Sequence, residues 1–171
     1  FSSEIYEIKE LQEQIANFAS TMAEKLRKQH SVTSEMVVFA YTNRFKEDTP
    51  QTYANALVSF VTPTADQRTI ITEAVHAMQK SFKSGYGYKK AGVIATKIID
   101  EKNVMHSLFE DTEAIEREHK ITSALDAINS TFGKGTIKLA VQGSGKIKTS
   151  SESQSPHYTT LWSDIPNVTV K

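Results

Sequence analysis

The segment Ser84–Lys97 holds the residues of this sequence best suited to binding a nucleic acid. It reads SGYGYKKAGVIATK, with three lysines, two tyrosines and no acidic residue. Lysine ammonium groups neutralise phosphates, while glycine and strand N–H groups let a sugar-phosphate chain come close. The segment Thr42–Lys46 is a second short polar stretch and carries two cations. Both segments predict contacts with a nucleic-acid backbone, and an ordinary solvated strand edge explains the same composition equally well.

Patterns typical of catalysis or metal binding are weak in this sequence. The run Gly143–Lys146 lacks the first Gly and the final Ser or Thr of a phosphate-binding loop, because Ala140 and Ile147 occupy those positions. The five histidines do not show the short spacing that places two metal ligands on one helix face. Paired carboxylates suited to holding two Mg²⁺ ions are not visible. We therefore expect no catalytic residue, no metal site and no cofactor in this chain.

A Leu-Phe pair lies in the most acidic part of the sequence. Residues 99–118 carry 2 basic and 7 acidic residues, and the segment Met105–Phe109 (MHSLF) lies among them. Apolar side chains in an acidic connector have no local core to join, which is typical of short peptides that dock in the groove of a partner. Packing of this pair against its own domain is an equally good interpretation.

The first hundred residues predict two helices and four strands. Apolar residues recur at steps of three and four over residues 8–29, which predicts an amphipathic helix. Thr64 and Gln67 form a capping-box pattern that predicts the start of a second helix, with its end near Gly85. Strands are predicted at residues 1–6, 36–41, 53–61 and 91–99. This βαββαβ order predicts an α+β fold in which two helices cover one face of a four-stranded sheet and leave the other face open.

A smaller unit is predicted beyond the acidic segment. Helical spacing over residues 113–132 and a stop at Gly133 predict a third helix. A strand is predicted at residues 136–141, followed by a mobile loop over 142–156 that is rich in Gly, Ser and Lys. The predicted organisation is a domain at residues 1–100, an acidic linker at 101–118 and a small helix-and-strand domain at 119–171.

The overall composition excludes several classes of protein. The chain has 171 residues, 20 basic and 20 acidic side chains and no cysteine, so disulfides and thiolate metal sites are impossible. No apolar run reaches the ~18 residues that a membrane-spanning helix needs. The lack of cysteine favours a reducing cytoplasm. Because the first residue is Phe1 and not Met, we expect this sequence to be part of a longer protein.

Several stretches resemble one protein family. AEKLRKQHS, VFAYTNRF and GYGYKKAGV are similar to the little-finger region of UmuC-type (ImpB/MucB/SamB) proteins of the Y family, the type to which the catalytic subunit of DNA polymerase V belongs. LDAINSTFGKGTIKLAVQG and SPHYTTLWSDIP resemble the small domain of unknown function that ends those polymerases. The similar segments cover most of the chain in a preserved order. The little finger implied by the resemblance has the βαββαβ order expected above.

The resemblance implies a role for each part of the chain. In this family the little finger lays one sheet face along the DNA major groove and holds the backbones of template and primer without reading their sequence. A clamp-binding peptide that follows it in many such polymerases matches Leu108 and Phe109, with Met105 where Gln is usual. The DNA-binding residues implied by the resemblance are Ser2, Ser3, Thr42, Asn43, Arg44, Lys89 and Lys90.

The resemblance also implies an activity and partners for the parent protein. The palm and its metal-binding carboxylates precede this region in the family, so we expect this chain not to polymerise DNA. The parent is implied to be an error-prone, translesion DNA-directed DNA polymerase with Mg²⁺ in its palm. The implied partners are primer-template DNA, the sliding clamp, the cleaved UmuD dimer and the RecA filament. No association with a membrane is implied. The alternative from another class is a stand-alone ferredoxin-like module that binds RNA on sheet aromatics or acts in regulation.

Overall fold

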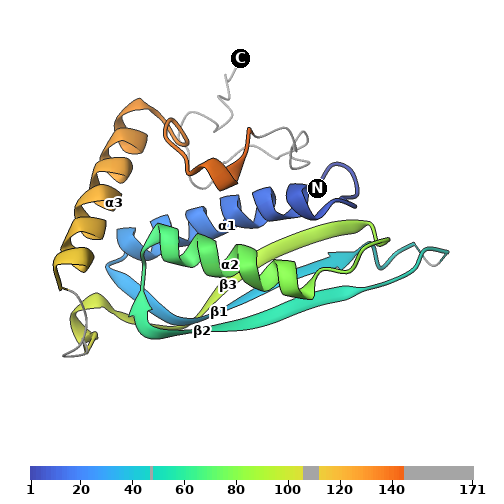
Figure 1. The fold of residues 1–171 in the computed structure, drawn as a ribbon, viewed down its shortest axis with the longest axis horizontal. Helices are drawn as coiled ribbons and strands as arrows, with labels where there is room; N and C mark the ends of the chain where they lie inside the picture. The colour runs from blue at the N-terminus through green and yellow to red at the C-terminus, as the bar shows by residue number, and fades with distance from the viewer. Residues whose placement is uncertain (47, 106–111, 145–171) are drawn as a thin grey trace, which may run out of the picture.

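The computed structural model describes residues 1–46, 48–105 and 112–144 (Figure 1). Its strands form one antiparallel sheet in the order β2-β1-β3. The α+β class predicted from the sequence is confirmed. The elements are α1 (Ile8–Lys28), β1 (Ser31–Thr42), β2 (Tyr53–Thr64), α2 (Gln67–Ser81), β3 (Tyr88–Asp100), the 3-10 turn η1 (Glu101–Asn103), α3 (Thr112–Phe132) and the 3-10 turn η2 (Ala140–Gln142).

Helices α1 and α2 lie on one face of the sheet and leave the opposite face uncovered (Figure 1). Along β1, Met36, Val38 and Ala40 are fully buried, and the residues between them are partly exposed. This alternation follows from the two-residue period of a strand that has one covered face. The buried side chains form a single core with Ile15 of α1 and Ile71 of α2. The predicted arrangement of two helices on one face of the sheet is therefore confirmed.

Helix α2 begins later and ends earlier than the sequence predicts. Its N-cap is Asp66, whose carboxylate accepts a hydrogen bond from the backbone N–H of Thr69 at 2.7 Å. Thr64 is instead the last residue of β2, and its hydroxyl accepts a hydrogen bond from the N–H of Asp66. The helix ends at Ser81, so Gly85 lies in the following turn, with a φ of 84°. The predicted N-cap at Thr64 is wrong because the carboxylate of Asp66 is an equally suitable cap.

The segment predicted as the first strand joins the sheet at one position only. Ile5 and Tyr88 form an isolated antiparallel bridge, with N···O distances of 2.9 and 2.8 Å. The backbone nitrogen of Phe1 also donates to the carbonyl of Lys89 at 3.0 Å. In the described part of the chain the sheet is therefore three-stranded, and the predicted fourth strand is not confirmed. Residues 1–6 instead follow the outer edge of β3 at its beginning.

Helix α3 stands at the end of the helix layer (Figure 1). Polar side chains connect it to that layer. The carboxylate of Asp126 accepts two hydrogen bonds from the guanidinium of Arg27 on α1, at 2.7 and 2.8 Å. Near η2, Gln142 and Asn17 exchange hydrogen bonds of 3.1 and 3.2 Å. These contacts place residues 112–144, here named the C-terminal segment, on the helix side of the sheet.

The predicted strand at residues 136–141 is wrong, because these residues form a turn and the beginning of η2. The side chain of Asn129 on α3 hydrogen-bonds to the backbone N–H and carbonyl of Ile137, the groups that a neighbouring strand would bind in a sheet. Its carbonyl oxygen accepts from the N–H of Ile137 at 2.9 Å, and its amide donates to the carbonyl at 3.1 Å. Most of the predicted loop at 142–156 lies outside the described residues. No described helix is both long and apolar enough to cross a bilayer.

Candidate nucleic-acid interface

The sheet face turned away from α1 and α2, here named the open face, is more apolar than the sequence suggested. Directly paired residues of neighbouring strands share this face. Leu57 and Ile94 are 63% and 51% exposed on it, so a broad part of the face is aliphatic. The residues that share the open face are Glu35, Val37, Phe39 and Tyr41 of β1, Tyr53, Asn55, Leu57 and Ser59 of β2, and Lys90, Gly92, Ile94 and Thr96 of β3.

Three rings form an aromatic cluster on the open face, consisting of Phe39, Tyr41 and Tyr53. The rings of Phe39 and Tyr41 are stacked, with centroids 6.0 Å apart and planes at 19°. Tyr41 and Tyr53 are cross-strand partners whose centroids lie 6.1 Å apart. Gly92 faces Phe39 across the sheet, and a Cβ at Gly92 would lie 2.7 Å from Cζ of the Phe39 ring. The ring therefore lies directly over the backbone of β3.

Two cations lie beside the aromatic cluster. The guanidinium carbon of Arg44 is 5.0 Å from the centroid of the Tyr41 ring, and Nζ of Lys90 is 5.9 Å from it. Both cationic side chains are exposed. Attraction between a cation and the face of an aromatic ring holds such side chains near the ring without neutralising their charge. The end of the open face where β1 finishes and β3 begins is thus aromatic and positively charged.

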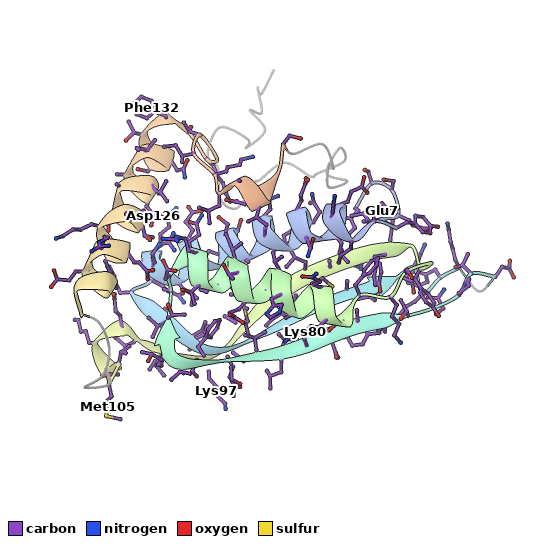
Figure 2. All side chains as sticks on the ribbon, viewed as in Figure 1. Glu7, Lys80, Lys97, Met105, Asp126 and Phe132 are labelled. Carbon is purple, nitrogen blue, oxygen red and sulfur yellow. The ribbon has the colours of Figure 1, made fainter. Side chains whose placement is uncertain are left out.

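The three lysines of the Ser84–Lys97 segment do not share one environment. Lys90 pairs with Tyr41 and faces the open side, whereas Lys89 falls at the irregularity in register between Tyr41 and Thr42, and its ammonium donates to the carbonyl of Ser2 at 3.0 Å. Lys97 forms an ion pair with Glu35, which β1 brings to the opposite end of the open face. Figure 2 shows Lys97 projecting away from the helix layer. Lys90 is therefore the lysine of this segment best placed to meet a phosphate on the open face.

The other residues implied by the resemblance lie at the same end of the sheet. Thr42 is buried, and its hydroxyl bonds to the Gln51 side chain at 2.6 Å, so it supports the β1–β2 loop from inside. The side-chain oxygen of Asn43 accepts from the N–H of Phe45 at 3.2 Å and shapes the turn. Ser2 and Ser3 are exposed beside the start of β3. Of the three predicted loop residues, Arg44 is the one that presents a cation to solvent.

Lys46, the second cation of the Thr42–Lys46 segment, is neutralised by a carboxylate from far away in the sequence. Its ammonium lies 2.8 Å from one oxygen of Glu4, and the hydroxyl of Tyr6 donates to the other oxygen at 2.9 Å. The hydrogen bond from Lys46, followed by that from Tyr6, holds the pKa of Glu4 below its usual value. The same carboxylate raises the pKa of Lys46. This ion pair ties the β1–β2 loop to the N-terminal segment.

A cleft lies on the opposite side of the molecule. It has a volume of about 730 Å³ and lies between α1 and the segment formed by α3 and the turns after it. Four of the charged groups that line it form two ion pairs, Arg27 with Asp126 and Lys28 with Glu24. The cleft is thus an interface between two parts of the chain and is separate from the open face.

The predicted clamp-binding residues are described only in part. Met105 follows η1 and is 91% exposed. It projects away from the body of the protein (Figure 2). Leu108 and Phe109 lie outside the described residues. In the described ranges, His, Asp and Glu side chains do not gather in groups of three or more that could hold a metal ion.

Sequence reasoning missed the aromatic cluster as a functional feature. Phe39 and Tyr41 fall in the strand predicted at residues 36–41, Tyr53 begins the strand predicted at 53–61, and none of the three is among the predicted binding residues. A signal was present, because Phe39 and Tyr41 stand two residues apart and must lie on one face of any strand that contains both. The third ring could not be placed without the register of the β1–β2 hairpin.

Comparisons with known proteins agree with the resemblance. Residues 1–108 match the impB/mucB/samB family C-terminal domain, and residues 119–168 match a domain of unknown function, DUF4113. Protein UmuC of Salmonella typhimurium is 32% identical over 169 residues, which is 98% of this chain and 40% of that protein. Protein ImpB of the same species is 30% identical over 97% of this chain and 39% of its own length.

A more distant relative carries a polymerase name. DNA polymerase IV of Desulfatibacillum aliphaticivorans is 25% identical over 82% of this chain and 34% of that protein. The chain thus spans about two fifths of the length of UmuC and ImpB. The family match and the UmuC and ImpB relatives all include the sheet and its two covering helices. The chain therefore belongs to the impB/mucB/samB (UmuC-type) family, and residues 1–108 carry the C-terminal domain of that family.

Proposed function

We propose that the open face binds the backbone of primer-template DNA within an error-prone translesion DNA polymerase. In this proposal the chain holds the DNA and does not carry the catalytic site. The observation that carries the proposal is the position of Arg44 and Lys90. Both exposed cations meet over Tyr41 at one end of a sheet face that neither covering helix reaches. A polymerase setting is supported by a relative named DNA polymerase IV.

The proposed grip is local and independent of DNA sequence. In the described part of the chain, Lys46 at this end of the sheet and Lys97 at the opposite end are each paired with a carboxylate, and Arg44 and Lys90 are the cations beside Tyr41. Contacts to phosphates fix position and carry no sequence information directly. Two neutralised phosphates correspond to a slope of about −1.8 in the logarithm of affinity against the logarithm of salt concentration. We therefore expect weak but distinctly salt-sensitive binding.

The activity of the parent protein is part of the proposal. Its reaction would be template-directed nucleotidyl transfer past damaged bases, with Mg²⁺ bound elsewhere in the parent. The described residues of this chain do not supply a carboxylate cluster for that ion, so we assign it no step here. The UmuD dimer and the RecA filament are proposed partners on the family resemblance alone.

The test is the salt dependence of DNA binding, measured by fluorescence anisotropy on a primer-template duplex. Lys90→Ala and Arg44→Ala should each flatten the slope by about 0.9. Lys80→Ala is the matched control, because Lys80 is an exposed lysine on α2, on the covered side of the sheet. Lys89→Ala should change the slope less than Lys90→Ala, because the ammonium of Lys89 already donates to the carbonyl of Ser2. Unchanged slopes in both open-face variants would refute the phosphate role.

Docking of a sliding clamp is a separate part of the proposal. A peptide of residues 101–112 contains Met105, Leu108 and Phe109 and should bind the clamp with a dissociation constant in the micromolar range. The substitution of Leu108 and Phe109 by Ala in the same peptide is the control and should abolish binding. Absence of binding by the unmodified peptide at high micromolar concentration would reject the clamp assignment.

A further inference from the structure

We propose that the aromatic cluster of Phe39, Tyr41 and Tyr53 is a stacking site for unpaired bases of single-stranded DNA. The inference rests on the proposed function and extends it, because it assigns to the same end of the open face a second form of the substrate. Duplex DNA offers phosphates and base edges to a protein, whereas base faces become available only where the strand is unpaired.

The position of the cluster suits this role. Phe39 and Tyr41 lie on β1, the central strand, and Tyr53 extends the cluster onto β2. The Tyr53 ring is half exposed, at 50% for the whole residue, although a ring of this size next to a core would usually be buried. None of the three side chains belongs to the core between the sheet and the helices. The cluster thus forms an aromatic surface turned toward solvent.

The cations beside the cluster supply the second element that a stacked strand needs. Arg44 and Lys90 flank Tyr41 at 5.0 and 5.9 Å from the ring centroid, within reach of the phosphates that join successive stacked bases. An aromatic platform combined with a positively charged border is the usual means of binding single strands without sequence preference. Leu57 and Ile94 continue the surface beyond the rings and add apolar area without charge.

Stabilisation of the hairpin by cross-strand ring contacts is the competing explanation of the cluster. The two explanations differ in their consequences. A purely structural cluster would affect binding of duplex and single strand equally, through folding alone. A stacking site would affect the single strand selectively, and the difference can be measured on a protein whose fold is intact.

The experiment compares Tyr53→Leu with Tyr6→Leu in the full chain. Tyr6 is matched in exposure, at 53% against 50%, and lies outside the cluster, bonded to Glu4. The probes are labelled oligo-dT of about 15 nucleotides, within the range of single-strand site sizes, and a duplex of similar length. Circular dichroism and thermal unfolding confirm that each variant is folded.

Tyr53→Leu should weaken binding of oligo-dT by about fivefold or more, the lower end of the effect of one base–aromatic stack. Its duplex affinity should stay within about twofold, and Tyr6→Leu should change neither. Two results would overturn the stacking site and leave the proposed function standing. One is an equal loss of affinity for both probes, and the other is an unchanged affinity for oligo-dT while duplex binding remains salt-sensitive. Failure of the unmodified chain to bind any DNA would reject both. Tighter, Tyr53-dependent binding of oligo-U than of oligo-dT would overturn the assignment to DNA.

Discussion

The Arg27–Asp126 ion pair should couple the C-terminal segment to the helix layer with a measurable free energy. The guanidinium makes two hydrogen bonds to Asp126, at 2.7 and 2.8 Å, and one to the carbonyl of Ala65 at 2.9 Å. The side chains are 19% and 36% exposed, which lies between a surface pair and a buried pair. Surface pairs contribute roughly 0.2–1 kcal/mol, and hydrogen bonds to charged groups about 1.5–3 kcal/mol. We expect a coupling energy of about 1–2 kcal/mol.

A double-mutant cycle in urea unfolding measures this coupling, with Arg27→Ala, Asp126→Ala and the double variant. Arg27→Ala should cost more than Asp126→Ala, by about 1 kcal/mol, because it also leaves the carbonyl of Ala65 without this donor. The Glu24–Lys28 pair on α1 is the matched control, since its lysine is 72% exposed and its coupling should be smaller than that of Arg27 and Asp126. A coupling between Arg27 and Asp126 no larger than the control value would refute this account of how α3 is held.

Three further predictions concern the sheet and its loops. The pKa of Glu4 is lowered in the folded chain. The stability that its ion pair contributes is therefore present above the ordinary pKa of about 4.5 and is lost as the pH falls through the lowered value. Glu4→Gln should remove this part of the acid dependence of Tm. Gly92→Ala should destabilise by about 1 kcal/mol, because the new Cβ meets the Phe39 ring, and Phe39→Leu in the same chain should restore part of the loss in urea unfolding. Thr42→Val should lower the free energy of unfolding by about 1–3 kcal/mol, because the Thr42 hydroxyl is buried and hydrogen-bonded. The DNA affinity of the folded variant should stay unchanged, and a selective loss of DNA affinity would instead support direct contact of Thr42 with DNA.

The elements that the sequence predicts well are those with strong local periodicity. The apolar stripe of residues 8–29 predicts helix α1 almost to the residue, because one face of the helix is buried from Leu11 to Leu26. The start of α2 was misplaced because Thr64 and Asp66 are both good N-caps. Pairing of Thr64 with Thr33 keeps Thr64 in β2, and this long-range contact has no local signal.

The candidate site was harder to predict because it depends on which side of a strand each residue takes. Lys89 and Lys90 are neighbours in the sequence with similar chemistry, but Lys90 lies beside Tyr41 on the open face, whereas Lys89 bonds to the carbonyl of Ser2. The pairing of Lys46 with Glu4 joins segments that only the folded chain brings together. Composition therefore indicated a basic patch, whereas strand alternation and long-range pairing determine which of its cations remain available.

The most direct test of the central claim is a lysine-acetylation footprint, read by mass spectrometry, of the full chain with and without primer-template duplex. Lys90 on the open face should be protected by DNA at low salt, and Lys80 on α2 should react at the same rate in both samples. Protection of Lys90 should disappear as salt releases the duplex. Protection of Lys80 with an unprotected Lys90 would show that the helix layer, not the open face, meets the DNA, and would contradict the account.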